Sequence, residues 1–266
     1  MNYYHYLIFL LVALVGIAMP VKKAEAGHLV VLMVGDTKAE NIGEGVEKDL
    51  RNMQAEVQEI SHYTGLEVEE VVISNEQVKR GEILNEISNL EVHSNDVLMF
   101  FYSGHGSHEG KDPSNPWPYL LLSRDRTTID LDKINDLMMA KHPRFYLSVA
   151  NACNGLAPPG DSPGILELKS EVDYSWLISH NSRTEANYKK LFLDSQGAIL
   201  VTSSKVGEPS YGRPAYGGYY PYAFVTGLQE VAKNSKFPSW EKVLRIASKQ
   251  VQVKQTPDYK LISLKD

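Results

Sequence analysis

The stretch Asp96–Gly106, DVLMFFYSGHG, changes character in its middle. Its first half, Val97–Tyr102, is an unbroken run of apolar and aromatic residues, which is typical of a strand buried on both faces of a sheet. Its second half places one histidine, His105, between two glycines that break the strand. The stretch therefore predicts a central strand that presents a histidine at its carboxyl end.

Strand and helix patterns alternate along the rest of the chain. Apolar runs predict strands, and apolar residues spaced by three and four predict helices. The expected strands cover residues 28–35, 68–73, 97–102, 145–150 and 197–202, the expected helices 42–60, 78–90, 130–140, 222–231 and 239–253, and the longest expected loops 111–126, 155–196 and 211–222. This alternation predicts an α/β fold of three layers, with a mostly parallel central sheet and helices on both faces.

The first 26 residues differ from the rest of the chain. Residues 7–18 form an apolar run of signal-peptide length, and Ala24–Ala26 matches a cleavage pattern. We therefore predict a signal peptide over 1–26, one domain over 27–266, and export to the periplasm or the medium. At 12 residues the run is short for a membrane span, which needs roughly 20. Because Lys22 and Lys23 follow the run, an uncleaved membrane anchor is the alternative.

The charge and the cysteine content bear on which partners and which covalent cross-links the protein can have. The formal net charge of −6 comes without long charge runs, so we expect no nucleic-acid partner. Cys153 is the only cysteine, so no intrachain disulfide can form and stability has to come from the core. Free cysteine is most often a small buried apolar residue. In an oxidising compartment, a lone thiol is a liability unless it is buried or used.

Cys153 lies in NACNG, directly after the expected strand 145–150 and 48 positions after His105. Ligands of open parallel sheets bind outside the carboxyl ends of the strands, so the two strands bring a histidine and the thiol to the same edge. A thiolate is a strong nucleophile, and an imidazole can take its proton and return it to a leaving amine. We predict a catalytic dyad, with Cys153 as the nucleophile and His105 as the general acid and base.

FFYSGHG resembles the histidine motif of metacaspases and their bacterial relatives among the caspase-like cysteine peptidases. NACNG is similar to the cysteine motif of that family and shares A-C-x-G with caspases. Weaker similarities are GVEKD, ILVTSS and YAFVT, which spread over nearly the whole predicted domain. The resemblance implies a caspase-like fold and endopeptidase activity on protein or peptide substrates. It also implies an oxyanion hole formed by the backbone N–H groups of Gly106 and Cys153.

The resemblance leaves the substrate preference open. Metacaspases carry an aspartate two residues before the cysteine, where this chain has Asn151, and caspases hold aspartate with an arginine where it has Gly43. Asp49 matches the family aspartate of the first helix, and it either supplies a negative charge to the pocket or is a surface residue. We predict Asp49, Asn151 and Ser103 as substrate-binding residues. We expect a basic residue before the scissile bond, with an asparagine-type or other neutral residue second.

Metal sites have little support in the sequence. His105 and His108 form H-x-x-H, but the intervening glycine favours a turn over a helix and no second thiol exists. We therefore predict no zinc site and interpret His108 as a solvated loop residue. Asp36, Asp161 and Asp173 are scattered, so nothing supports a calcium site, and we predict no cofactor.

Two long segments carry the remaining hypotheses. In the family, the linker that corresponds to 155–196 is often cut during activation, which makes Lys169, Arg183, Lys189 and Lys190 candidate cleavage points. The tyrosine-rich segment 211–222 is either one wall of a substrate groove or an ordinary surface loop. The alternatives to a peptidase are a catalytically silent binding or regulatory module on the same fold and a thiol hydrolase of other substrates.

Overall fold

The computed structural model describes residues 27–110, 112, 114–155 and 182–265. The predicted signal peptide, the candidate cleavage point Lys169, and Asp161 and Asp173 lie outside these residues. Across the described part of the chain, the structure contains no helix with the length and apolar character needed to cross a membrane.

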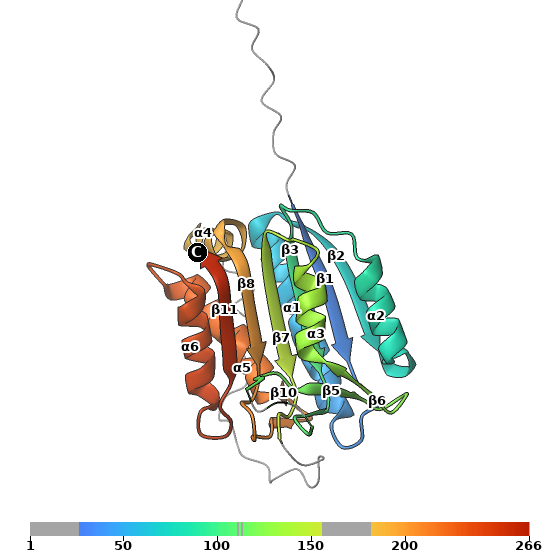
Figure 1. Ribbon diagram of the computed structural model, residues 1–266. Coiled ribbons are helices and arrows are strands. Elements are labelled where there is room, and N and C mark those ends of the chain that lie inside the picture. Colours follow the sequence, from blue (N-terminus) through green and yellow to red (C-terminus); the bar gives the residue numbers. More distant parts are fainter. Residues whose placement is uncertain (1–26, 111, 113, 156–181, 266) are drawn as a thin grey trace, which may run out of the picture.

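A six-stranded sheet forms the centre of the fold, in the order β11-β8-β7-β3-β1-β2 (Figure 1). The strands are β1 (His28–Gly35), β2 (Glu67–Ser74), β3 (Val97–Ser103), β7 (Phe145–Asn151), β8 (Gln196–Thr202) and β11 (Asp258–Lys265). All neighbours pair in parallel except β11, which runs antiparallel to β8 at the edge. The prediction of a mostly parallel sheet is confirmed, and β11 is an addition to it.

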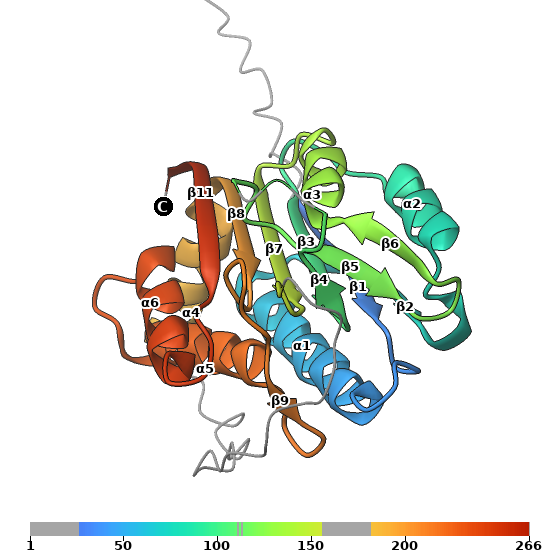
Figure 2. The same ribbon diagram turned by 60° about the horizontal axis from the view of Figure 1, so that its bottom comes forward.

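Helices cover both faces of the sheet, which gives three layers (Figure 2). Within the described ranges, one face carries four helices: α1 (Gly43–Thr64), α4 (Ser182–Lys189) with its π-helical continuation (Lys190–Asp194), α5 (Tyr219–Asn234) and α6 (Trp240–Val251). The other face carries α2 (Arg80–Asn89) and α3 (Leu131–Met139). Successive residues of β1 alternate between the two cores: Leu29 packs on the α1 side, and Val30 packs on the α2 side. Because both faces are buried, the central strands are continuous apolar runs.

The expected loops contain short elements that the sequence analysis did not predict. They are β4 (Gly106–Ser107), β5 (Tyr119–Leu122) and β6 (Thr127–Asp130), which form one small sheet, the hairpin of β9 (Gly212–Arg213) and β10 (Gly217–Gly218), the single turn η1 (Asn75–Gln77), and α4. The loop predictions were wrong in these parts, because strands of two to four residues are too short for a periodic pattern. β5, β6 and β10 lie at the end of the sheet to which the parallel strands point (Figure 1).

Candidate functional site

The histidine and cysteine motifs lie side by side along their whole length. β3 and β7 are neighbours in register, with Ser103 opposite Asn151. Beyond the sheet, the N–H of Gly104 donates to the carbonyl oxygen of Asn151 at 3.1 Å, and the N–H of His108 donates to that of Gly155 at 2.7 Å. Two segments far apart in sequence therefore form one continuous edge at the carboxyl end of the sheet.

Gly106 marks the closest approach of the two segments. A Cβ atom at this position would overlap the carbonyl oxygen of Cys153, and it would lie 2.7 Å from the Cβ atom of Ala152 and 3.2 Å from the backbone nitrogen of Cys153. Only glycine leaves room for this contact. The structure thus brings together Gly106 and Cys153, the two residues predicted to form an oxyanion hole.

The thiol of Cys153 is held by the backbone of Ser210. Its Sγ atom accepts the N–H of Ser210 at 3.3 Å and donates to the carbonyl oxygen of Ser210 at 3.7 Å. Burial raises the pKa of the Cys153 thiol, although the hydrogen bond from the Ser210 backbone acts in the opposite direction. The resting side chain is therefore a protonated thiol, and forming the nucleophilic thiolate requires a base.

His105 is oriented by a backbone carbonyl from the loop between β1 and α1. Its Nε2 atom lies 3.1 Å from the carbonyl oxygen of Glu40. Because a carbonyl oxygen only accepts hydrogen bonds, Nε2 carries the proton in this contact, and Nδ1 of the neutral ring keeps its lone pair. His105 is thereby in the tautomer that can take up a proton through Nδ1. A backbone partner such as Glu40 leaves no signal in a sequence.

Asp49, Ser103 and Asn151 form one buried network. Oδ2 of Asp49 accepts the hydroxyl of Ser103 at 2.7 Å and the side-chain amide of Asn151 at 3.0 Å, and Oδ1 accepts the N–H of Gly218 at 2.7 Å. Because Asp49 is buried, its alternative interpretation as a surface residue is wrong. Burial raises the pKa of Asp49 to about 7, although the three hydrogen bonds lower it. The structure thus brings the three predicted substrate-binding residues together.

The β9–β10 hairpin covers this network. A Cβ atom at Gly217 would overlap the carboxylate of Asp49, and one at Gly218 would overlap the side-chain amide of Asn151, so both positions require glycine. Arg213 belongs to the same hairpin, and its buried Nε and Nη2 atoms have no hydrogen-bond partner among the described residues. A guanidinium group with unused donors is suited to binding a carboxylate.

His108 is buried, which corrects its interpretation as a solvated loop residue. Its Nδ1 atom pairs at 2.8 Å with Oδ1 of Asn154, whose amide nitrogen donates to the carbonyl oxygens of Pro116 and Ser204 at 2.8 and 3.1 Å. The pair joins the two motif segments to neighbouring loops. Neither His108 nor His105 belongs to a group of three potential metal ligands in the ranges that the structure covers.

Three polar residues beyond β8 hold the cysteine segment, and the sequence analysis assigned no role to any of them, although Ser203 lies in the ILVTSS stretch. Ser203 accepts the N–H of Ala152 through Oγ at 3.1 Å, and Ser210 donates its hydroxyl to Oδ1 of Asn151 at 2.8 Å. The side-chain amide of Gln255 donates to the carbonyl oxygen of Ser203 at 2.8 Å. Serine and glutamine are ordinary loop residues, so no sequence pattern distinguishes them.

Known proteins resemble this chain in sequence pattern and in fold. A family model described as a caspase domain, of the peptidase family C14, matches residues 30–266. The structure of caspase-1 from Spodoptera frugiperda is similar, with a TM-score of 0.54 and 15% identity, over 89% of this chain and 88% of that chain. A protein from Geobacter sulfurreducens is similar with a TM-score of 0.51 and 16% identity, over 90% and 95% of the two chains. At these identities the structural likeness shows the fold alone. A search of curated proteins found no match.

Proposed function

Because the chain belongs to the caspase-domain family of cysteine peptidases, we propose that it hydrolyses peptide bonds, with Cys153 as the nucleophile and His105 as the general acid and base. The observation that carries the proposal is the alignment of the two motif segments from Ser103–Asn151 onward. This alignment puts the only cysteine and the motif histidine at the same edge of the sheet.

Each step of the proposed reaction uses a group described above. Nδ1 of His105 takes the thiol proton as Sγ of Cys153 attacks the carbonyl carbon of the peptide. The carbonyl oxygen becomes an anion, which the N–H groups of Gly106 and Cys153 stabilise. His105 then gives its proton to the departing amine nitrogen, the C–N bond breaks, and a thioester remains. Water, deprotonated by His105, then attacks the thioester carbon, the C–S bond breaks, and the thiolate of Cys153 takes the proton back from His105 as the acid product leaves.

Two groups support opposite preferences for the residue before the scissile bond. The carboxylate of Asp49 supports the basic preference expected from the sequence, but it already accepts three hydrogen bonds and its pKa is raised to about 7. Arg213 supports an acidic preference, because its buried donors are unused within the described ranges. A side chain with unused donors gains more from a ligand than one already satisfied. The contacts therefore favour an acidic residue over a basic one.

A library of peptides with aspartate, asparagine, arginine or lysine before the cut, incubated with the purified protein, tests both the peptidase activity and the preferred residue. Cys153→Ala and His105→Ala should abolish turnover, and His142→Asn, which removes an exposed histidine outside the site, should retain it. Turnover that survives Cys153→Ala overturns the nucleophile. Arg213→Gln should lower kcat/KM for aspartate substrates by about 10- to 150-fold, the value of a charged hydrogen bond. If only Asp49→Asn shifts the preference, and it lowers cleavage after arginine, the basic preference is correct.

A silent module on the same fold is the competing proposal. It predicts that the folded protein cleaves no member of the library, although iodoacetamide still modifies Cys153. Turnover that depends on both His105 and Cys153 excludes it.

Three of the four candidate points for self-cleavage lie in helical segments. Arg183 and Lys189 lie in α4, and Lys190 begins its π-helical continuation. Peptidases take up substrate backbone in an extended form, so a cut at these residues requires the helix to unwind. Lys169 is outside the described residues. We therefore propose that any self-cleavage occurs before α4, which mass spectrometry of the processed chain tests against the Cys153→Ala variant.

We also propose export, on the basis of residues 1–26 alone. Amino-terminal sequencing of the protein secreted from its host should find Gly27 as the first residue. An intact amino terminus in the membrane fraction would support the anchor instead.

A further inference from the structure

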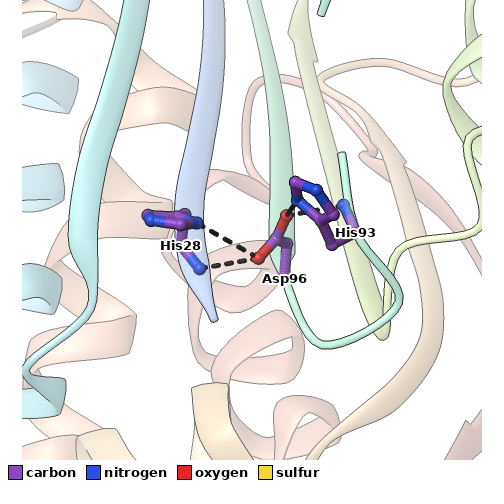
Figure 3. A group of neighbouring side chains, drawn as sticks. All are labelled: His28, His93 and Asp96. Carbon is purple, nitrogen blue, oxygen red and sulfur yellow. Dashed lines mark hydrogen bonds and ion pairs between the residues drawn. The ribbon is translucent and has the colours of Figure 1, made fainter. Parts of the chain in front are cut away.

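Three potential metal ligands gather at the end of the sheet opposite the cysteine, where β1 and β3 begin (Figure 3). His28 is the first residue of β1, Asp96 directly precedes β3, and His93 lies in the turn between α2 and β3. One ligand atom from each residue lies within 4.8 Å of the other two. Because 68 positions separate His28 from Asp96, sequence spacing did not indicate this cluster.

The carboxylate of Asp96 is fixed by the backbone before any ion binds. Its Oδ1 atom accepts the N–H of His28 at 2.7 Å, and Oδ2 accepts the N–H of His93 at 2.6 Å. Asp96 is only 1% exposed, so these bonds hold it in a single orientation. A carboxylate oxygen has two acceptor positions, so Oδ1 keeps one for a metal ion. The second position of Oδ2 faces Nδ1 of His93 at 3.3 Å, and an ion bound to both atoms would replace this contact.

The two imidazole rings lie on either side of this carboxylate (Figure 3). Nδ1 of His28 is 3.6 Å from Oδ1 of Asp96, and Nδ1 of His93 is 3.3 Å from Oδ2. Ligand atoms about 2.1 Å from a tetrahedral ion are about 3.4 Å apart, so each separation suits an ion held between that ring and the oxygen it faces. A single shared ion requires both carboxylate oxygens or a small rotation of one ring. The His93 side chain is 69% exposed, so its ring has room to rotate toward the ion.

A fourth ligand and a favourable charge are also present. Oε1 of Glu69, in β2, lies 3.9 Å from Nδ1 of His28, and its side chain is 53% exposed and able to turn toward the ion. Glu67 adds a second exposed carboxylate beside His28. Arg144 is the cation that acts on Asp96, but its guanidinium group donates to three backbone carbonyls. Three carboxylates against one guanidinium leave the cluster negative.

We propose that His28, His93 and Asp96 bind a divalent transition-metal ion, with Zn²⁺ as the first choice, that joins the start of β1 to the turn before β3. Two imidazoles and one carboxylate suit Zn²⁺ and its substitute Co²⁺, whereas Mg²⁺ and Ca²⁺ prefer sites made of oxygen atoms alone. Glu69 or a water molecule completes four-coordination. The site lies at the end of the sheet remote from Cys153, so it stabilises the fold and does not depend on the proposed peptidase activity.

The test uses the protein without a polyhistidine tag and with Cys153→Ala, because the thiol with His105 is itself a potential zinc site. Isothermal titration should find one Zn²⁺ per chain, and Co²⁺ should give the visible absorption of a four-coordinate site. Zn²⁺ at 100 times its Kd should raise the Tm by about 5–10 °C. Mg²⁺ and Ca²⁺ at the same concentration should leave the Tm unchanged.

His93→Ala is the decisive variant, because it removes an exposed ligand and leaves the core and the backbone bond to Asp96 in place. We expect the Zn²⁺ affinity to fall at least tenfold and the rise in Tm to disappear, whereas His142→Asn should behave as the parent. The proposal is overturned if the Cys153→Ala protein binds no Zn²⁺, or if His93→Ala binds it with unchanged affinity.

Discussion

Glu56 should make the protein less stable as the pH rises. It lies in α1, is buried, and accepts the hydroxyl of Tyr188 in α4 and the side-chain amide of Gln229 in α5, each at 2.7 Å. Burial raises the pKa of Glu56 from 4.5 to about 8, against the two hydrogen bonds. The folded protein therefore keeps a proton at this carboxyl group under conditions in which the unfolded chain has lost it.

The sign and size of the effect follow from this difference in pKa. Between pH 4.5 and about 8 the folded state binds more protons than the unfolded state, so the free energy of unfolding decreases as the pH rises. The contribution of Glu56 is complete below pH 4.5 and is lost as the pH passes through its folded pKa of about 8. At about 1.4 kcal/mol per pKa unit, the total loss is about 4–5 kcal/mol.

Glu56→Gln isolates this contribution, because glutamine has the same shape and does not titrate. The amide of Gln229 can rotate to offer its oxygen to the new side chain, which keeps both hydrogen bonds. Urea unfolding at pH 5, 7 and 9 should show the variant gaining about 4 kcal/mol on the parent between the lowest and highest pH. Glu44→Gln, an exposed change in the same helix, should follow the parent within about 1 kcal/mol. Parallel curves for Glu56→Gln and the parent would refute the reasoning.

Three more predictions concern the motif segments. Gly106→Ala should lower kcat at least about 100-fold, because the added methyl group overlaps the carbonyl oxygen of Cys153 and displaces the N–H proposed to bind the oxyanion. Full peptidase activity in the variant would contradict this. His108→Ala should lower the free energy of unfolding in urea by about 2–4 kcal/mol, because it opens a cavity and leaves Oδ1 of Asn154 without its donor. A loss below about 0.5 kcal/mol would count against a buried hydrogen bond. Because burial raises the pKa of Cys153, iodoacetamide should react with it more slowly at pH 7 than with cysteine in an unfolded peptide. The rate should rise about tenfold per pH unit. Equal rates at pH 7 would show an accessible thiol with an ordinary pKa.

The central layers could be predicted because burial on both faces leaves a strong pattern. β1 and β3 contain continuous apolar runs, β7 contains one that only Ser148 interrupts, and α6 aligns Trp240, Val243, Leu244 and Ala247 on its buried face. The caspase-like fold predicted from the two motifs is confirmed by the match over residues 30–266. β11 was missed because an edge strand whose residues are all partly or fully exposed has no continuous apolar run.

In the candidate site, the sequence allowed predictions only for residues that are unusual by themselves. His105 and Cys153 stand out because one lies between glycines and the other is the only thiol. The burial of Asp49 could not be foreseen, because the hairpin residue that donates to it, Gly218, lies 169 positions later. The carbonyl oxygen of Glu40 that accepts from His105 and the N–H of Ser210 that donates to Cys153 are backbone groups, which any residue type provides.

The position of β8 between β7 and β11 has a consequence for a chain cut at Lys169. The amino-terminal piece would keep β7, His105 and Cys153, while the carboxyl-terminal piece would supply β8 and β11 to the same sheet. Tyr188 of α4 would also remain bonded to Glu56 across the break. Two polypeptides would then share one hydrophobic core, so a denaturing gel would separate what gel filtration elutes as a single heterodimer.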